Sequence, residues 1–249
     1  DDLICETQTI YTLSGAAASN YASLGWATSG DGTFNDPLSL NPLYTPGIAD
    51  ITAGSVVLTL TAYGNFPCPD FQSSLTLSIS RQAIISAGTD LTICQTSGSV
   101  QLTTPSASFA TSLSWATSGT GTFDDATILN PVYLFSAADI AAGSVVLTLT
   151  GTSTAPCVDA SDDMTLFITS QALVYAGPDD IICETQPAYT LGAATAGNNT
   201  SILWTTSGSG TFSDPTILNP DYTPSAADIA AGTVTLTLNS YAIVPCADA

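Results

Sequence analysis

The sequence has no histidine and no lysine, and its only basic residue is one arginine. Histidine and lysine are the commonest general bases and Schiff-base amines, so their absence counts against catalysis. The 21 acidic residues leave a net charge of −20, which repels nucleic-acid phosphates and anionic lipid surfaces. No run of about 18 apolar residues is present to span a membrane. We therefore expect no enzyme, no nucleic-acid partner and no membrane insertion in this segment.

What the sequence does contain is one pattern that occurs three times without insertions. Three kinds of residue recur at intervals of 89 positions: Trp26, Trp115 and Trp204; Cys5, Cys94 and Cys183; Cys68, Cys157 and Cys246. A fixed period indicates tandem copies of one unit. We predict three domains, 1–89 (repeat 1), 90–178 (repeat 2) and 179–249 (repeat 3). Repeat 3 stops before its final strand, so we expect the sequence to be part of a longer protein.

The cysteines are the clearest chemical feature of the repeat. Each copy has two, 63 positions apart, and an even count at a repeated spacing indicates one disulfide per domain in an oxidising compartment. The alternative is zinc, but two cysteines per copy without histidine make at best half a site. We predict the pairs Cys5–Cys68, Cys94–Cys157 and Cys183–Cys246.

The order of strand and turn signals predicts an all-β fold. Turn residues recur every 8–12 positions between runs of Val, Ile, Leu and Thr, which is typical of a β-sandwich. The Ser-Gly-x-Gly-Thr-Phe segment that starts at Ser29 predicts a tight hairpin with glycines at positive φ. The Ser-x-x-Asp segments at Ser136 and Ser225 predict capping boxes of short helices. About seven strands per copy would form a two-sheet sandwich.

The combined motif Trp-x-Thr-Ser-Gly-x-Gly-Thr-Phe, Leu-Asn-Pro-x-Tyr, Ala-Asp-Ile-x-Ala-Gly and Pro-Cys-x-Asp covers essentially every copy. It resembles the immunoglobulin-like or PKD-like tandem repeats of giant Bacteroidota surface proteins, such as flavobacterial gliding-motility adhesins exported by the type IX secretion system. The resemblance implies an extracellular cell-surface adhesin or filament with these domains as its stalk, and no catalytic residues. Because the first cysteine lies in the first strand, the disulfide would tie an edge strand to the Pro-Cys-x-Asp loop.

The acids offer weak candidates for calcium, which prefers clustered carboxylates and carbonyls. The candidates are Asp90, Asp179, Asp180, Asp36, Asp125 and Asp214. The alternative is turn chemistry, because Asp next to Gly favours loops. Asp50, Asp139 and Asp228 are better explained as helix caps. The pairs Asp124-Asp125 and Asp162-Asp163 could in principle serve glycoside hydrolysis, but neighbours on a strand face opposite ways and neither pair recurs in the other copies. No cofactor is expected apart from this possible calcium.

The aromatic residues form the predicted core. They are Trp26, Trp115 and Trp204; Phe34, Phe123 and Phe212; Tyr44, Tyr133 and Tyr222. The tryptophans lie on the strand where a sandwich normally buries its largest ring. If these rings were exposed instead, they could stack on sugars. The alternative interpretation is therefore an array of carbohydrate- or ligand-binding modules.

The segments between copies are short and apolar, for example Ala83-Ile84-Ile85, so we expect semi-rigid joints. A domain should add on the order of 35–45 Å, giving an extended rod of more than about 100 Å. The predicted function is a structural and adhesive stalk that presents a distal binding region. Its partners would be neighbouring repeats of the same chain, other copies in a fibre, and a surface or glycan receptor that the sequence does not identify.

Overall fold

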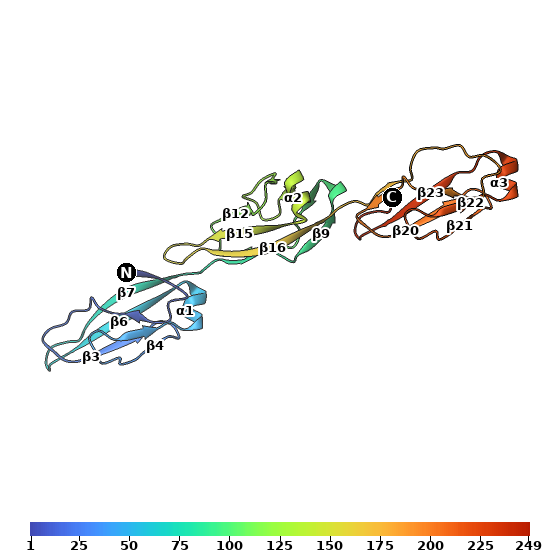
Figure 1. The fold of residues 1–249 in the computed structure, drawn as a ribbon. Helices are drawn as coiled ribbons and strands as arrows, with labels where there is room; N and C mark the ends of the chain where they lie inside the picture. Colours follow the sequence, from blue (N-terminus) through green and yellow to red (C-terminus); the bar gives the residue numbers. More distant parts are fainter.

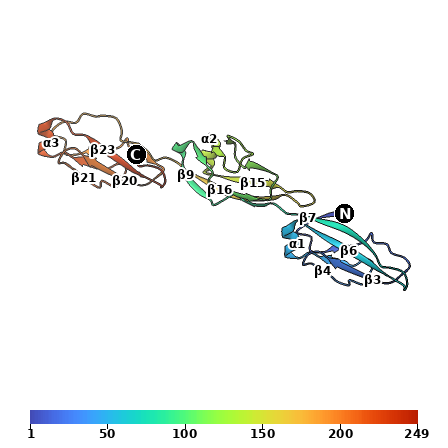
Figure 2. The same cartoon turned by 180° about the vertical axis from the view of Figure 1, so that it is seen from behind.

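The computed structural model describes all residues 1–249 as three similar β-rich bodies in a line (Figure 1). The view from behind shows the same elongated arrangement, with the C-terminus at the junction of the second and third bodies (Figure 2). Repeat 1 contributes β1 (Asp2–Cys5), β2 (Tyr11–Thr12), β3 (Tyr21–Thr28), β4 (Thr33–Phe34), β5 (Leu43–Thr45), α1 (Ile48–Ala53), β6 (Ser55–Gly64) and β7 (Phe71–Ser80).

The second body repeats this order with two added strands, one at its start and one before the tryptophan strand, and a short 3-10 helix. Its elements are β8 (Ile84–Ser86), β9 (Leu91–Cys94), η1 (Gln95–Ser97), β10 (Ser99–Gln101), β11 (Ser106–Ser108), β12 (Ser112–Thr117), β13 (Thr122–Phe123), β14 (Val132–Leu134), α2 (Ala137–Ala142), β15 (Ser144–Thr152) and β16 (Ala160–Thr169). By sequence period β8 belongs to repeat 1, but it pairs with β11 of repeat 2. The second and third bodies therefore take their first strand from just before the 89-residue boundary.

The third body has seven strands, against nine in the second. Its elements are β17 (Leu173–Tyr175), β18 (Tyr189–Thr190), β19 (Thr195–Gly197), β20 (Asn199–Thr206), β21 (Thr211–Phe212), β22 (Asp221–Thr223), α3 (Ala226–Ala231) and β23 (Leu236–Ala242). No helix of the protein is long and apolar enough to cross a membrane.

Two sheets face each other in each complete body. In repeat 1, the sheet β1-β7-β6-β3 packs on the sheet β2-β5-β4, and in repeat 2 the sheets are β12-β15-β16-β9 and β10-β14-β13. The long strands β6 and β7 are antiparallel, whereas β1 runs parallel to β7. Alternating apolar residues on β6, β7 and their equivalents place Leu and Val on the inner face, so ten buried residues form the core of repeat 1 and eleven that of repeat 2.

The short helices have the predicted caps. Ser136 Oγ accepts a hydrogen bond from the Asp139 N–H at 3.1 Å, and Asp139 Oδ2 accepts one from the Ser136 N–H at 2.9 Å. Ser225 and Asp228 make the same reciprocal pair. The capping boxes predicted from the sequence are therefore confirmed.

The hairpin glycines have a different role from the predicted one. Gly30 and Gly32 are not at positive φ. A β-carbon at Gly30 would instead collide with the carboxylate of Asp50, and one at Gly32 with the Tyr44 hydroxyl. The prediction of positive φ is therefore wrong. Glycine is needed at these positions because a larger residue would collide with buried side chains, not because the backbone is left-handed there.

Candidate functional site: the joints between repeats

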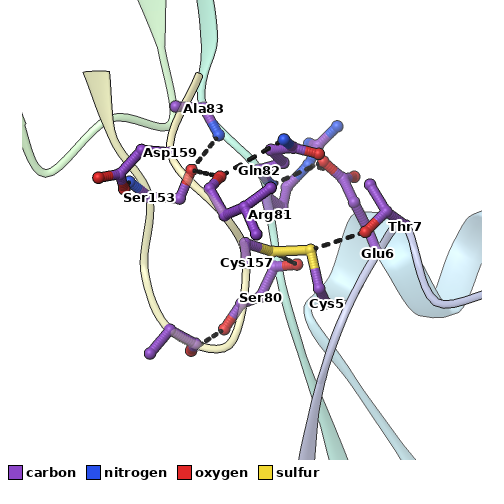
Figure 3. Close-up of a disulfide and its surroundings, with 12 residues drawn as sticks. Cys5, Glu6, Thr7, Ser80, Arg81, Gln82, Ala83, Ser153, Cys157 and Asp159 are labelled. Atoms are coloured by element: carbon purple, nitrogen blue, oxygen red, sulfur yellow. Dashed lines mark hydrogen bonds and ion pairs between the residues drawn. A yellow bond between two sulfur atoms is a disulfide. The ribbon is translucent and has the colours of Figure 1, made fainter. Parts of the chain in front are cut away.

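The disulfides lie between repeats, not within them. Cys5 is bonded to Cys157, and Cys94 to Cys246, each with Cα atoms 4.9 Å apart. Cys68 and Cys183 are free and exposed. The predicted pairs Cys5–Cys68, Cys94–Cys157 and Cys183–Cys246 are therefore wrong. In Figure 3 the bond joins the end of the first strand of one repeat to a loop of the next.

Strand direction explains the correction. Cys5 lies beside Ser80 at the end of β7, because β1 and β7 are parallel. Cys68 precedes the start of β7 at Phe71. Ten residues of extended strand separate these two ends by about 30 Å, whereas a disulfide needs Cα atoms within about 7 Å. The loop that carries Cys157 reaches Cys5 because repeat 2 is stacked on the end of β7.

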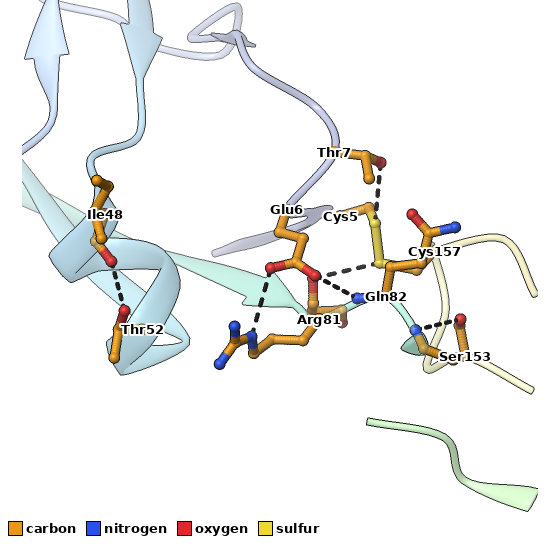
Figure 4. A network of polar contacts seen from close by, with 11 residues as sticks. Cys5, Glu6, Thr7, Ile48, Thr52, Arg81, Gln82, Ser153 and Cys157 are labelled. Atoms are coloured by element: carbon orange, nitrogen blue, oxygen red, sulfur yellow. Dashed lines mark hydrogen bonds and ion pairs between the residues drawn. A yellow bond between two sulfur atoms is a disulfide. The ribbon is translucent and has the colours of Figure 1, made fainter. Parts of the chain in front are cut away.

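We define joint 1 as the Cys5–Cys157 bond with the linker of residues 81–83. Backbone groups of the linker are hydrogen-bonded to both neighbours: Gln82 N–H donates to Glu6 Oε1 at 2.8 Å, and Ala83 N–H donates to Ser153 Oγ at 3.0 Å (Figure 4). Ser80 Oγ donates across the joint to the Ala155 carbonyl at 3.1 Å. The linker is thus held by repeat 1 on one side and by repeat 2 on the other.

The Pro-Cys-x-Asp motif shapes the loop that carries the second cysteine. Asp159 Oδ1 accepts the backbone N–H of Ser153 at 2.9 Å. Asp70 and Asp248 accept the equivalent groups of Gly64 and Ala242 in the other repeats. The recurring Asp therefore closes the loop that carries the cysteine.

The only arginine of the chain also lies in joint 1. Arg81 Nε is 3.4 Å from Glu6 Oε2, and its guanidinium lies 4.0 Å from the centre of the Phe109 ring. Phe109 has φ of 59°, a left-handed conformation that costs a bulky side chain energy. The ion pair is partly exposed, so it adds no more than about 1 kcal/mol. The main restraint of the joint is therefore covalent.

Joint 2, the Cys94–Cys246 bond with residues 170–172, repeats the arrangement with neutral groups. Gln171 Nε2 donates to the Ala247 carbonyl at 2.6 Å, and Asn198 Nδ2 donates to the Gln171 carbonyl at 3.1 Å. Asn198 occupies the position of Phe109 and has φ of 55°. The residue at this position of the repeat thus contacts the linker at both joints, through a cation–π contact at Phe109 and a hydrogen bond at Asn198.

Each linker leads directly into the next sandwich. β8 pairs with β11 and β17 with β19, immediately after the linkers. Ala83, Ala87 and Ala172 are buried. Because the backbone hydrogen bonds of these segments are made with the following repeat, the linkers have little freedom to swing.

The aromatic residues lie inside the sandwiches. The tryptophans Trp26, Trp115 and Trp204 and the tyrosines Tyr44, Tyr133 and Tyr222 are buried; the phenylalanines Phe34, Phe123 and Phe212 are partly buried. Each Phe ring lies between a Trp and a Tyr, for example Phe123, with ring centroids 5.7 Å from Trp115 and 4.9 Å from Tyr133. Buried rings are not available to stack on sugars, which counts against the carbohydrate-binding alternative.

A buried carboxylate joins the short helix to the hairpin in every repeat. Tyr44, Tyr133 and Tyr222 donate their hydroxyls to Asp50, Asp139 and Asp228 at 2.6, 2.9 and 2.8 Å. Burial opposes ionisation of Asp139, but the N–H groups of Ser136 and Thr120 outweigh it, so its pKa is lowered. The N–H groups of Ser225 and Ser209 lower the pKa of Asp228. Burial, followed by the bond to Asp50, raises the pKa of Tyr44 to about 12.

The calcium candidates are dispersed. Asp36, Asp125 and Asp214 each accept the N–H two residues further on, as in ordinary turns. Asp90 accepts the Thr165 N–H, and Asp180 accepts that of Ile181. Asp179 occupies the position of Asp90 in the third repeat. The structure contains no group of three or more metal-ligating side chains, so it does not bring these candidates together.

Sequence reasoning found the cysteines of the joints but missed Glu6, Arg81, Phe109 and Ser153. One signal was available: the single arginine of the chain lies within the short segment between two repeats. Phe109 is replaced by Asn20 and Asn198 in the other copies, and Glu6 recurs only as Glu184, so the repeat pattern did not single out these two residues.

No family model matches the chain, and no curated protein matches it. Among solved structures, a titin fragment of domains I67–I69 in an E-to-A mutated variant aligns with 12% identity and a TM-score of 0.56, over 100% of this chain and 92% of that one. The I-band fragment I67–I69 from titin gives 10% identity and 0.55 over the same shares. Protocadherin gamma B7 domains 1–4 reach only 0.43, at 12% identity over 100% and 72%, which is too low to support an argument. The all-β fold of tandem immunoglobulin-like sandwiches, predicted from the sequence, is confirmed.

Proposed function

We propose that this chain is a stalk segment of an extracellular repeat protein, in which neighbouring domains are cross-linked so that the stalk resists bending and stretching. The observation that supports the proposal best is the pair of disulfides across the joints. A bond between domains does little for either core, but it limits how far the domains can separate under tension.

The two bonds overlap along the chain. Cys94 lies inside the loop closed by Cys5–Cys157, and Cys157 lies inside the loop closed by Cys94–Cys246. The shortest covalent path between the termini then runs through residues 1–5, 94–157 and 246–249. At about 3.5 Å per residue it spans about 250 Å, against about 870 Å for the whole chain without disulfides.

Chemistry and resemblance support the finer assignments. Disulfides favour an oxidising compartment, and a net charge of −20 favours solubility of a long extracellular chain. With the sequence resemblance, they favour a cell-surface adhesin or filament of the Bacteroidota type IX kind, acting through structure rather than catalysis. We also propose three domains that divide near the linkers 81–83 and 170–172. The partners would be neighbouring repeats, other copies in a fibre and an unidentified receptor.

Single-molecule stretching tests the stalk function. The chain is pulled from its termini with and without a thiol reductant, and the fully extended length is compared. We expect about 250 Å when oxidised and about 870 Å when reduced. Equal lengths under both conditions would contradict a stalk whose extension is limited by disulfides.

A further inference from the structure

Phe109 in joint 1 has a backbone conformation that does not suit its side chain. Asn20, Phe109 and Asn198 are equivalent in the three repeats, and all three have positive φ, of 58°, 59° and 55°. Asparagine tolerates this left-handed conformation, whereas a bulky residue such as phenylalanine is destabilised by it. Burial offsets the cost only in part, because Phe109 is 45% exposed. Its ring is instead in contact with Arg81, whose guanidinium lies 4.0 Å from the ring centre.

Arg81 connects the two repeats without using the cysteines. Its Nε atom lies 3.4 Å from Glu6 Oε2 of repeat 1, and its guanidinium lies over the Phe109 ring of repeat 2. Glu6 Oε1 also accepts the Gln82 N–H at 2.8 Å, so one carboxylate holds both the side chain and the backbone of the linker. Because Glu6 directly follows Cys5, these contacts act beside the disulfide (Figure 4).

The place of the only basic residue matters because the repeats repel each other. The 21 acidic residues are spread over all three repeats and leave a net charge of −20. Like charge opposes the approach of two acidic bodies. Arg81 is the only positively charged side chain of the protein, and it lies in the linker between repeats 1 and 2. It therefore weakens the repulsion where these two repeats meet.

Joint 2 lacks the whole set. The positions that carry the carboxylate, the guanidinium and the ring in joint 1 are occupied there by neutral residues, Gln95, Ser170 and Asn198. Asn198 suits the left-handed backbone, and its Nδ2 donates to the Gln171 carbonyl at 3.1 Å. The three groups are thus replaced together, as expected of side chains that act as a unit. Joint 2 is the natural reference for joint 1 within the same molecule.

We propose that Arg81 is a positioning residue for the Cys5–Cys157 disulfide. Its contacts with Glu6 and Phe109 dock repeat 2 on repeat 1 while the cysteines are still thiols, and so raise the effective concentration of one thiol at the other. Oxidation then closes a joint that is already ordered. The two thiols lose two electrons and two protons, which convert a disulfide oxidant such as glutathione disulfide to two thiols. The inference rests on the cross-linked stalk proposed above and names the residue that aligns joint 1.

A redox equilibrium tests the positioning role on the full chain with Cys68→Ser and Cys183→Ser, which leaves only the cysteines of the joints. The protein is equilibrated with mixtures of glutathione and glutathione disulfide, and its thiols are then trapped by alkylation. Chymotryptic peptide mapping quantifies the two disulfides separately. Arg81→Ser should lower the equilibrium constant of the joint 1 disulfide about threefold to tenfold, the combined range of an exposed ion pair and a cation–π contact.

The controls separate positioning from a general loss of structure. The equilibrium constant of the joint 2 disulfide should not change in Arg81→Ser. Arg81→Lys, which keeps a positive charge near the carboxylate and the ring, should restore most of the loss at joint 1. In a Phe109→Asn background, Arg81→Ser should have a smaller effect. Equal effects with and without the ring would overturn the proposal, because Arg81 would then act on repeat 1 alone.

Amide hydrogen exchange in the fully reduced protein tests the order of events. The disulfides lie outside the cores of repeats 1 and 2, so both sandwiches should stay folded when reduced. The Gln82 and Ala83 amides, which donate to Glu6 and Ser153, should remain protected, and Arg81→Ser should remove the protection. Exchange of both amides at the rate of an unfolded linker in the reduced parent would overturn the proposal, because docking would then follow oxidation.

The two proposals fail in different ways. If the oxidised parent protein contains no Cys5–Cys157 bond, both the cross-linked stalk and the positioning role of Arg81 are wrong. If the bond forms but Arg81→Ser leaves both equilibrium constants unchanged, only the positioning role is wrong.

Discussion

Cys5 and Cys157 lie 152 positions apart in the sequence, and their disulfide joins the first strand of repeat 1 to a loop of repeat 2. The bond encloses nearly all of repeat 1 and most of repeat 2 in one covalent loop. Cys94, which is bonded to Cys246, lies within this loop. If repeat 1 or repeat 2 unfolds, the two disulfides therefore still connect it covalently to the next repeat. Neighbouring sandwiches therefore share their restraint on extension.

The tryptophan of repeat 2 should be essential for its core. Trp115 is 4% exposed in a core of eleven buried residues. Trp115→Ala should lower the free energy of unfolding by about 3–5 kcal/mol, because it leaves a large cavity. Denaturant unfolding followed by circular dichroism measures this. Ile128→Ala, at a residue 43% exposed, is the matched control and should change stability far less. A Trp115 variant as stable as this control would rule out the core role.

The buried tyrosine–carboxylate pair should stabilise the helix against the hairpin. Tyr133→Phe keeps the ring but removes the hydroxyl that Asp139 accepts at 2.9 Å. The loss should cost about 1.5–3 kcal/mol, the range for hydrogen bonds to charged groups. Tyr175→Phe, at a residue 53% exposed, should be nearly neutral in the same thermal unfolding experiment. Equal effects of the two substitutions would contradict a structural role for the pair.

Acid should destabilise the repeats through the same carboxylates. The pKa values of Asp139 and Asp228 are lowered in the folded protein, so folding favours their ionised forms. The stability they contribute is complete above the unfolded pKa of about 3.9 and is lost as the pH falls below it. Unfolding free energy measured from pH 7 to pH 2 should decline mainly below about pH 4.

An Asp139→Asn variant gives the control for the pH dependence. It should be less stable at pH 7 and lose less stability in acid than the parent protein. Asp163→Asn, at an exposed acid of the same repeat, should keep the parent profile. An acid decline that is unchanged in the Asp139 variant would assign the effect to other groups.

The joints should keep the chain extended in solution. Each linker is hydrogen-bonded to the repeats around it, and each joint has a disulfide. Small-angle scattering should give a maximum dimension above about 100 Å, since each domain adds on the order of 35–45 Å. A compact particle, with the dimension of a single globule of this length, would contradict the rod.

The repeat made much of this fold predictable. The Trp, Phe and Tyr of each copy recur at the positions of the sandwich core, and the Ser-x-x-Asp segments gave the helix caps at Ser136 and Ser225. These features depend on short-range patterns within one copy. Burial of Asp50 behind Gly30 was not predictable in this way, because it depends on side chains meeting across the sandwich.

The disulfide pairing shows the limit of reasoning from spacing. Bonds within a copy and bonds between neighbouring copies both preserve the period, so the cysteine positions are compatible with either. The choice depends on which ends of β1 and β7 lie together and on how the repeats stack. The roles of Glu6 and Arg81 could not be predicted for the same reason, because their contact with each other forms only where two repeats meet.

Trypsin tests the central claim, because Arg81 is its only cleavage site and lies in joint 1. The protein is denatured without reductant, its free thiols are blocked, and it is cut between Arg81 and Gln82. If Cys5 is bonded to Cys157, fragments 1–81 and 82–249 stay covalently connected on a denaturing gel and separate only when reductant is added. If the fragments separate without reductant, no disulfide links repeat 1 to the rest of the chain, and the cross-linked joint is contradicted.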